Sequence, residues 1–176
     1  MRYWLMKSEP DVFGIDDLER APGRTTGWEG VRNYQARNML RDDFRVGDLT
    51  FFYHSSCEVP GVAGIAKVVR AAYADPTQFD AKSEYYDAKS TRDAPRWFAV
   101  DVQLERRLEP VITLPELREH ERGALRDMLI LQRGNRLSVT PLTADEWRCV
   151  LALRPSRAST NAPRSTSGAR RASKKS

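Results

Sequence analysis

The chain has 176 residues, of which 40% are hydrophobic and 30% charged, a composition that suits one folded domain plus an appendage. No apolar run approaches the roughly 18 residues that span a bilayer, so we expect no membrane segment. The net charge of +5 arises in residues 154–176, which hold seven of the 29 basic residues and no acidic one. Residues 1–153 hold the other 22 basic residues and all 24 acidic residues, so their net charge is −2. Whole-chain charge therefore gives no argument that the folded part binds nucleic acid.

The segment 154–176, RPSRASTNAPRSTSGARRASKKS, has almost no apolar side chain larger than alanine. Such a segment cannot offset the entropy cost of ordering, so we expect a disordered basic tail. Cationic tails attract phosphate at low salt whatever their sequence, which favours weak, nonspecific attachment to polyanions. Residues 1–153 form the expected domain.

Short strands and helices follow one another irregularly in the first half of this domain. The run at 2–7, RYWLMK, is apolar on both faces and predicts a strand that is covered on both sides. Residues 13–20 predict a weak short helix, and residues 33–41 predict a helix with apolar side chains at helical spacing. Strands are predicted at 49–54 and at 61–73, the second rich in small and β-branched residues.

The second half begins with a long segment of little regular pattern, 74–95, and then predicts two strands and two helices. Clean alternation from 96 to 108 predicts a half-buried strand, and 136–142 predicts a short one. Two Thr-x-x-Glu capping boxes predict helix starts at Thr113 and Thr143. Because regular strand–helix alternation is missing, we expect an α+β fold, with a mostly antiparallel curved sheet or barrel and helices packed around it.

The usual catalytic and metal signatures are absent from the sequence. There is no phosphate-binding glycine loop, no dinucleotide fingerprint and no nucleophile elbow. His54 and Cys57 follow a predicted strand three residues apart, where their side chains face opposite ways, so we expect no metal site and no cofactor. The cysteines, Cys57 and Cys149, are far apart in sequence, which indicates free thiols and a reducing, cytoplasmic location.

The most informative stretch is WEGVRNYQARN at 28–38. Glycines at 27 and 30 flank Trp28 and allow a tight turn that exposes its indole. Groups that can read a base edge or reach phosphates follow: Glu29, Asn33, Tyr34, Arg32 and Arg37. An aromatic wall, an amide and arginines are the parts that hold an unstacked base. The alternative, which is more frequent on chemistry alone, is that Trp28 fills a core.

A second group of aromatic residues lies in the segment 76–97. Four aromatic side chains alternate there with four basic ones: Phe79, Tyr85, Tyr86 and Trp97 with Lys82, Lys89, Arg92 and Arg96. Long irregular segments in compact domains are usually functional or disordered, and the aromatic residues argue against disorder. The segment is either a loop pinned to the surface by its tyrosines or a lid that clamps a bound backbone.

Several ordered motifs resemble the EVE domain family, which includes the thymocyte nuclear protein group and many small bacterial proteins. These motifs are RYWLMKSEPDVFGIDDL, GWEGVRNYQARNML, GDLTFFYHSS, PGVAGIAKVV, AKSEYYDAKS, RWFAVDV and RLSVTPLTADEW. The resemblance covers about residues 2–153. It implies a PUA-like curved, mostly antiparallel β-barrel with flanking short helices, related to the YTH readers of methylated adenine in RNA.

The resemblance also implies a noncatalytic pocket for a modified base, with modified cytosine in DNA as the favoured ligand. Within that pocket Trp28 is the implied cage wall, and Lys7 and Ser8 lie at the rim. Placements made by position in the motifs are Asn33, Tyr34, Tyr53, His54 and Ser55, and Glu29 joins the pocket on its chemistry alone. Candidates for a second wall are Phe79, Tyr85 and Trp97. Candidates for phosphate contact are Lys7, Arg32, Arg37, Lys89 and the basic tail.

The expected partner is therefore nucleic acid, modified DNA or RNA, bound by a monomer that is cytoplasmic and can associate with the nucleoid. The main alternative is an ASCH-like hydrolase or ribonuclease in which His54, Glu29 and Lys7 act as base, acid and electrostatic stabiliser. A third possibility is a PUA-type binder of RNA or tRNA. The resemblance favours the noncatalytic reader among the three.

Overall fold

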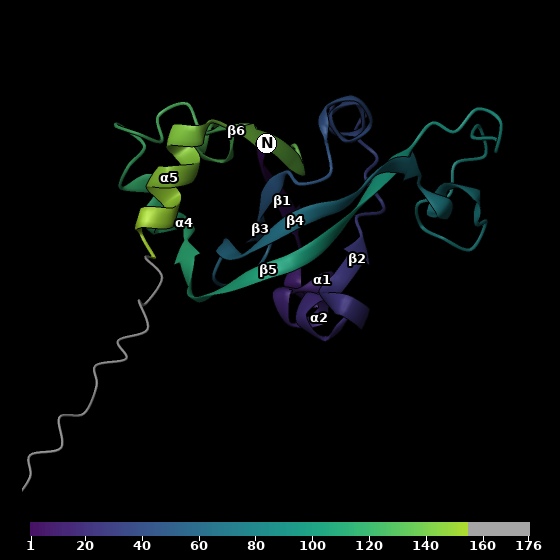
Figure 1. Cartoon of the computed structure of the whole chain (residues 1–176). Helices are drawn as coiled ribbons and strands as arrows, with labels where there is room; N and C mark the ends of the chain where they lie inside the picture. The colour runs from purple at the N-terminus through teal and green to yellow at the C-terminus, as the bar shows by residue number, and fades with distance from the viewer. Residues whose placement is uncertain (155–176) are drawn as a thin grey trace, which may run out of the picture.

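A six-stranded mixed sheet organises the chain (Figure 1). The computed structural model describes residues 1–154. The predicted basic tail lies outside the described residues except for Arg154, which forms an ion pair with Glu116. The strands are β1 (Tyr3–Ser8), β2 (Thr25–Gly27), β3 (Leu49–His54), β4 (Gly61–Ala74), β5 (Phe98–Thr113) and β6 (Val139–Leu142). Their order is β2-β5-β4-β3-β1-β6; β1 and β3 run parallel, and the other neighbours pair antiparallel.

Short helices flank the sheet. They are α1 (Pro10–Phe13), α2 (Ile15–Arg20), α3 (Tyr34–Asn38), α4 (Leu114–Arg118) and α5 (Ala144–Ala152), with the 3-10 turns η1 (Pro22–Arg24), η3 (Pro76–Phe79) and η4 (Leu129–Leu131) and the π-helical turn η2 (Met39–Asp43). Both predicted capping boxes are present: Thr143 Oγ1 accepts the Glu146 N–H at 3.1 Å, and the Glu146 carboxylate accepts the Thr143 N–H at 2.7 Å. Thr113 and Glu116 make the same exchange at the start of α4. The sequence signals for these two helix starts are confirmed.

The sheet separates two hydrophobic core clusters. The first core cluster includes Trp4, Met6, Ile15, Leu18, Trp28, Val31, Phe52, Val100, Val102 and Leu104. The second includes Leu5, Phe51, Tyr53, Leu117, Leu125, Trp147 and Val150. Successive residues of β1 and β3 enter opposite clusters, as side chains of a strand must. The prediction that the first strand is covered on both sides is confirmed.

The expected α+β class, with a PUA-like and mostly antiparallel sheet, is confirmed. Within it β2 and β6 stand at the two ends of the strand order, so the sheet is open rather than closed into the barrel that the family resemblance implied. The predicted strand at 96–108 continues to Thr113 in β5, and the helix expected at 33–41 changes to a π turn after Asn38. The three residues of β2 were not predicted.

The long β4–β5 ribbon positions the candidate site. It pairs from Gly61 with Thr113 to Ala74 with Phe98, and register shifts bend it along its length. In Figure 1 the segment between these strands projects beyond one end of the ribbon, whereas α4 and α5 lie toward the other end. The N–H of Asp75 donates to the Trp97 carbonyl at 3.0 Å and closes the base of this loop.

Candidate functional site

A cavity of about 790 Å³ opens between the end of β1, the turn after β2 and the loop after β4. Predicted site residues that line it are Lys7, Ser8, Trp28, Glu29, Arg32, Asn33 and Tyr85. The structure therefore brings together side chains from three distant parts of the sequence. The volume is within the roughly 300–1,000 Å³ of typical ligand pockets.

Trp28 is both a core residue and a wall of this cavity. Its side chain belongs to the first core cluster, is 8% exposed, and meets Phe52 edge to face with ring centres 5.5 Å apart. The backbone N–H of Trp28 donates to the Val100 carbonyl at 2.7 Å, and this hydrogen bond fixes the turn against β5. The two interpretations of Trp28 thus coexist, because a mostly buried indole still borders open space.

Tyr85 stands against the same turn. Gly30 has a φ of +78°, and a Cβ added there would lie 2.8 Å from the Tyr85 ring, so this position requires glycine for its backbone and for the close approach. Of the three candidates for a second wall, Tyr85 lines the cavity, whereas Phe79 and Trp97 do not. Tyr85 is the candidate that the geometry retains.

An ion pair beneath the cavity joins its walls. Arg32 Nη1 lies 2.8 Å from Oδ2 of Asp75, whose side chain is fully buried and also accepts the N–H groups of Gly30 and Thr77. Burial alone would raise the pKa of Asp75, but the hydrogen bonds from Arg32, Thr77 and Gly30 lower it overall. Arg32 also donates to the Tyr85 carbonyl at 2.6 Å. The expectation that Arg32 binds phosphate stays a prediction, which these internal hydrogen bonds disfavour.

The cavity lining carries more carboxylates than free cations. Glu9, Glu29 and Glu84 line it, together with Lys7 and the ion-paired Arg32. Lys7 has no ion-pair partner within residues 1–154, and burial lowers its pKa. The pKa of Glu29 is raised by partial burial and by the nearby carboxylates of Asp75 and Asp101. A lining with more carboxylates than free cations disfavours phosphate and suits a neutral ring that bears amino groups.

Two further polar residues of the lining are partly committed to the fold. Ser8 Oγ donates to the Phe13 carbonyl at 2.6 Å. Asn33 is the N-cap of α3, and its Oδ1 accepts the Ala36 N–H at 3.0 Å. The Asn33 amide nitrogen has no hydrogen-bond partner in the described part of the chain, so it is available as a donor.

The cavity lining does not include four of the predicted pocket residues: Tyr34, Tyr53, His54 and Ser55. Tyr53 is 2% exposed in the second core cluster, on the far face of the sheet, and burial raises its pKa to about 12. His54 Nε2 accepts the Ile15 N–H at 3.0 Å and so supports the start of α2. Ser55 donates its backbone N–H to the Ser8 carbonyl at 2.9 Å. The position of Tyr53 on the far face of the sheet contradicts its placement in a base pocket, whereas the placements of His54 and Ser55 stay predictions that the cavity lining does not support.

Tyr34, Trp97 and Arg37 form a cluster that does not line the cavity. The Tyr34 and Trp97 rings stack with centres 4.9 Å apart, and the Arg37 guanidinium lies over both rings. Arg37 also donates to the Arg96 carbonyl, and Trp97 Nε1 donates to Asp87 at 2.7 Å. These contacts pin the 75–97 loop to α3, which favours the surface-pinned loop over a mobile lid.

Phe79 and Lys89 occupy outer positions on that loop. Arg92 lies over the Phe79 ring, 5.1 Å from its centre. Lys89 is exposed, has no ion pair among residues 1–154, and lies four residues beyond Tyr85, so its proposed contact with phosphate is sterically open.

The sequence analysis did not identify Asp75 as a residue of the site. The signal was present, because Asp-Pro-Thr directly after a strand is a typical turn and cap sequence.

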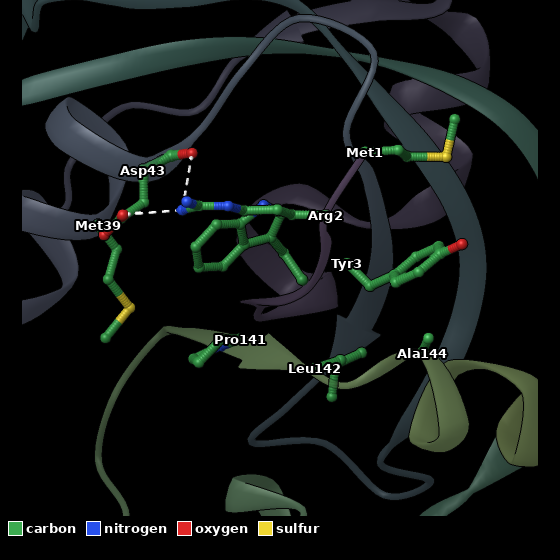
Figure 2. Close-up of a pocket in the computed structure, with 9 residues that line it drawn as sticks. Met1, Arg2, Tyr3, Met39, Asp43, Pro141, Leu142 and Ala144 are labelled. Atoms are coloured by element: carbon green, nitrogen blue, oxygen red, sulfur yellow. Dashed lines mark hydrogen bonds and ion pairs between the residues drawn. The ribbon is translucent and has the colours of Figure 1, made fainter.

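A second cavity, of about 550 Å³, lies between β1, β6 and the η2 turn (Figure 2). Arg2 crosses it and pairs with Asp43 at 2.8 Å. None of the predicted site residues lines this cavity. It therefore has no part in the predicted base pocket.

The fold and the cavity agree with the family comparison. A model described as the EVE domain matches residues 2–153. The chain belongs to the EVE domain family. Thymocyte nuclear protein 1 of Danio rerio is 48% identical over 165 residues, which cover 85% of this EVE domain chain and 71% of the relative. The human protein of that name is 45% identical, covering 86% and 73%.

Solved structures show the same fold. Human THYN1 in complex with 5-methylcytosine-containing DNA has a TM-score of 0.83 and 45% identity, and the match covers 87% of this EVE domain chain and 97% of the other. A Pseudomonas syringae protein has a TM-score of 0.81 and 49% identity, covering 86% and 99%. In residues 1–154 no helix is long and apolar enough to cross a membrane. Because the curated relatives are named as nuclear proteins, the cytoplasmic location stays a prediction.

Proposed function

We propose that this EVE domain is a noncatalytic reader of a modified base, with 5-methylcytosine in DNA as the ligand. The supporting observation is a cavity of about 790 Å³, large enough to admit a nucleobase, that is bordered by Trp28 and Tyr85. It occurs in a chain that is 45% identical to a human protein solved with 5-methylcytosine-containing DNA. The target nucleotide leaves the duplex and its base enters between these two side chains.

Stacking alone does not supply the affinity. Contact between a base and an aromatic ring contributes about 1–3 kcal/mol. Unstacking and unpairing the nucleotide cost a similar few kcal/mol. Affinity and specificity must therefore come from polar contacts in the cavity and from phosphates outside it.

Polar groups of the lining complement the edge of cytosine. The exocyclic amine of cytosine is a donor that carboxylates accept, so Glu29 is its proposed partner. The Lys7 ammonium and the Asn33 amide supply donors for the O2 and N3 acceptors of the base. Thymine places a carbonyl oxygen where cytosine has its amine, so a carboxylate opposite that position disfavours thymine.

The phosphates lie outside the cavity in this proposal. Its lining holds three carboxylates, so a backbone anion is disfavoured inside. Lys89 on the 75–97 loop contacts the backbone, and the basic tail adds nonspecific attraction. Arg37 has a lesser part, because it donates to the Arg96 carbonyl and covers two rings.

The hydrolase alternative loses its proposed base. His54 does not line the cavity, and its Nε2 already accepts a backbone N–H. A base must reach the proton that it abstracts, and here the acceptor nitrogen faces α2 instead. The constellation of His54, Glu29 and Lys7 is therefore not assembled around one reacting position.

A binding panel tests the proposed function. Duplexes that differ only in carrying 5-methylcytosine, cytosine or thymine at one position are titrated with the full chain at fixed salt. We expect the lowest Kd for 5-methylcytosine and the highest for thymine. Equal Kd values for the three duplexes would contradict the proposal, and displacement by structured RNA but not by methylated DNA would indicate the RNA-binding alternative.

A further inference from the structure

The segment 132–138, which leads into β6, lies at the rim of the base cavity. Ser138 lines the cavity, and its carbonyl accepts the Lys7 N–H at 2.8 Å. Leu137 packs against the first core cluster. The segment is thus attached to the same wall that carries Lys7.

Internal hydrogen bonds fix the backbone of this segment. Asn135 Nδ2 donates to the Leu129 carbonyl at 2.6 Å, and Asn135 Oδ1 accepts the Leu137 N–H at 2.9 Å. Gln132 Nε2 donates to the Arg126 carbonyl at 2.6 Å. A held backbone presents exposed side chains from defined positions, which lowers the entropy cost of contacts with a partner.

Arg133 and Arg136 are the exposed cations of this segment. Neither makes an ion pair or a side-chain hydrogen bond within the part of the chain that the structure describes, whereas Arg107 and Arg154 pair with carboxylates. From 128 to 144 the sequence has these two basic residues and no acidic one. A segment with two unpaired cations therefore leads to Ser138 in the lining of a cavity that has more carboxylates than free cations.

We propose that Arg133 and Arg136 are phosphate-contacting residues that hold the nucleic-acid backbone on one side of the nucleotide in the cavity. This inference rests on the proposed function and adds residues that were not among the predicted site residues. The separation of charge fits a nucleotide whose base enters the acidic interior while its phosphates stay outside. The exposed Lys82 and Lys89 belong to the 75–97 loop, whose Glu84 and Tyr85 line the cavity, so in this proposal they hold the backbone on another flank.

Salt dependence tests the inference. Each phosphate contact steepens the plot of log K against log salt by about 0.9 on duplex DNA. The double variant Arg133→Ala/Arg136→Ala, in the full chain, should flatten the slope by about 1.8 and weaken binding to methylated and plain duplexes equally. The double lysine variant should keep most of the slope, because lysine also neutralises phosphate.

Arg122→Ala is the matched control. Arg122 is exposed and has no ion pair among residues 1–154. It lies on the turn after α4, between Leu117 and Leu125, and both of these leucines pack in the second core cluster. We expect its slope to equal that of the unchanged chain. An unchanged slope in the alanine double variant, or an equal flattening by Arg122→Ala, would overturn the inference. Either result leaves the 5-methylcytosine preference intact, so it is distinguishable from failure of the proposed function.

Discussion

Arg32 donates from Nη1 to Oδ2 of Asp75 across 2.8 Å, and the Asp75 side chain is fully buried. The same carboxylate oxygen accepts the Gly30 N–H at 2.9 Å, and Arg32 also holds the Tyr85 carbonyl. One buried ion pair therefore joins the turn that carries Trp28 to the loop that carries Tyr85.

Loss of Arg32 should destabilise the chain strongly. Arg32→Ala leaves the buried Asp75 carboxylate without its cation, so the free energy of unfolding should fall by about 3–5 kcal/mol. Urea unfolding measures the difference. Arg20→Ala, which removes an exposed pair with Asp17, is the control and should cost less than about 1 kcal/mol. An equal loss in the free energy of unfolding for both variants would show that the Arg32–Asp75 pair does not join the two segments.

Gly30→Ala should damage the cavity through Tyr85. The added Cβ would lie 2.8 Å from the Tyr85 ring, and Gly30 has a φ of +78°. Gly47→Ala is the matched control, because Gly47 has a φ of +93° and nothing lies within 4 Å of its added Cβ. Both variants should lose stability from backbone strain, by about 1 kcal/mol. Only Gly30→Ala should also weaken binding to methylated DNA; equal Kd values for the two would contradict the contact with Tyr85.

Glu29→Gln should stabilise the chain while it impairs recognition. Partial burial and nearby carboxylates raise the Glu29 pKa, so ionisation is less favourable in the folded chain and its destabilising effect grows as pH rises through the carboxyl range. Tm should therefore increase at pH 7, and increase less at pH 4. The ratio of Kd values for thymine and cytosine should fall toward one. A lower Tm at pH 7 together with an unchanged ratio would contradict this assignment of Glu29.

His54 should make stability sensitive to mild acid. Burial lowers its pKa in the folded chain, against the raising effect of Asp16, so protonation favours the unfolded state. The stabilising contribution is complete above the ordinary histidine pKa of about 6.5 and is lost as pH falls toward the lower folded value. Unfolding from pH 8 to pH 5 should show this loss, and His54→Gln should flatten it. An identical pH profile in the variant would disprove the contribution.

Local signals in the sequence were sufficient for most elements, but the site depends on distant contacts. The helix starts at Thr113 and Thr143 follow from cap residues three positions from their partners. By contrast, Arg32 meets Asp75 across 43 positions, and β2 exists only through its pairing with β5. Proximity to an informative motif placed Arg32 among the phosphate ligands, although a buried carboxylate elsewhere in the chain determines its role.

The alternation of β3 explains the misplacement of Tyr53. Phe52 faces the first core cluster beside Trp28, so the next residue must face the second cluster. The alternation of side chains along the strand could be predicted from the sequence. Which face of the sheet carries the cavity could not. That face is set by the packing of α1 to α3 and of the turn around Trp28, which involves long-range contacts.

The most direct measurement is the Kd ratio of plain to methylated duplex for Trp28→Ala. Removing this buried indole should cost about 3–5 kcal/mol of stability, so folding of the variant is verified first. Phe52→Leu is the control, because Phe52 contacts Trp28 in the core without lining the cavity. The account predicts that Trp28→Ala reduces the ratio to one while Phe52→Leu retains it. A folded Trp28→Ala variant that kept the original ratio would contradict the account.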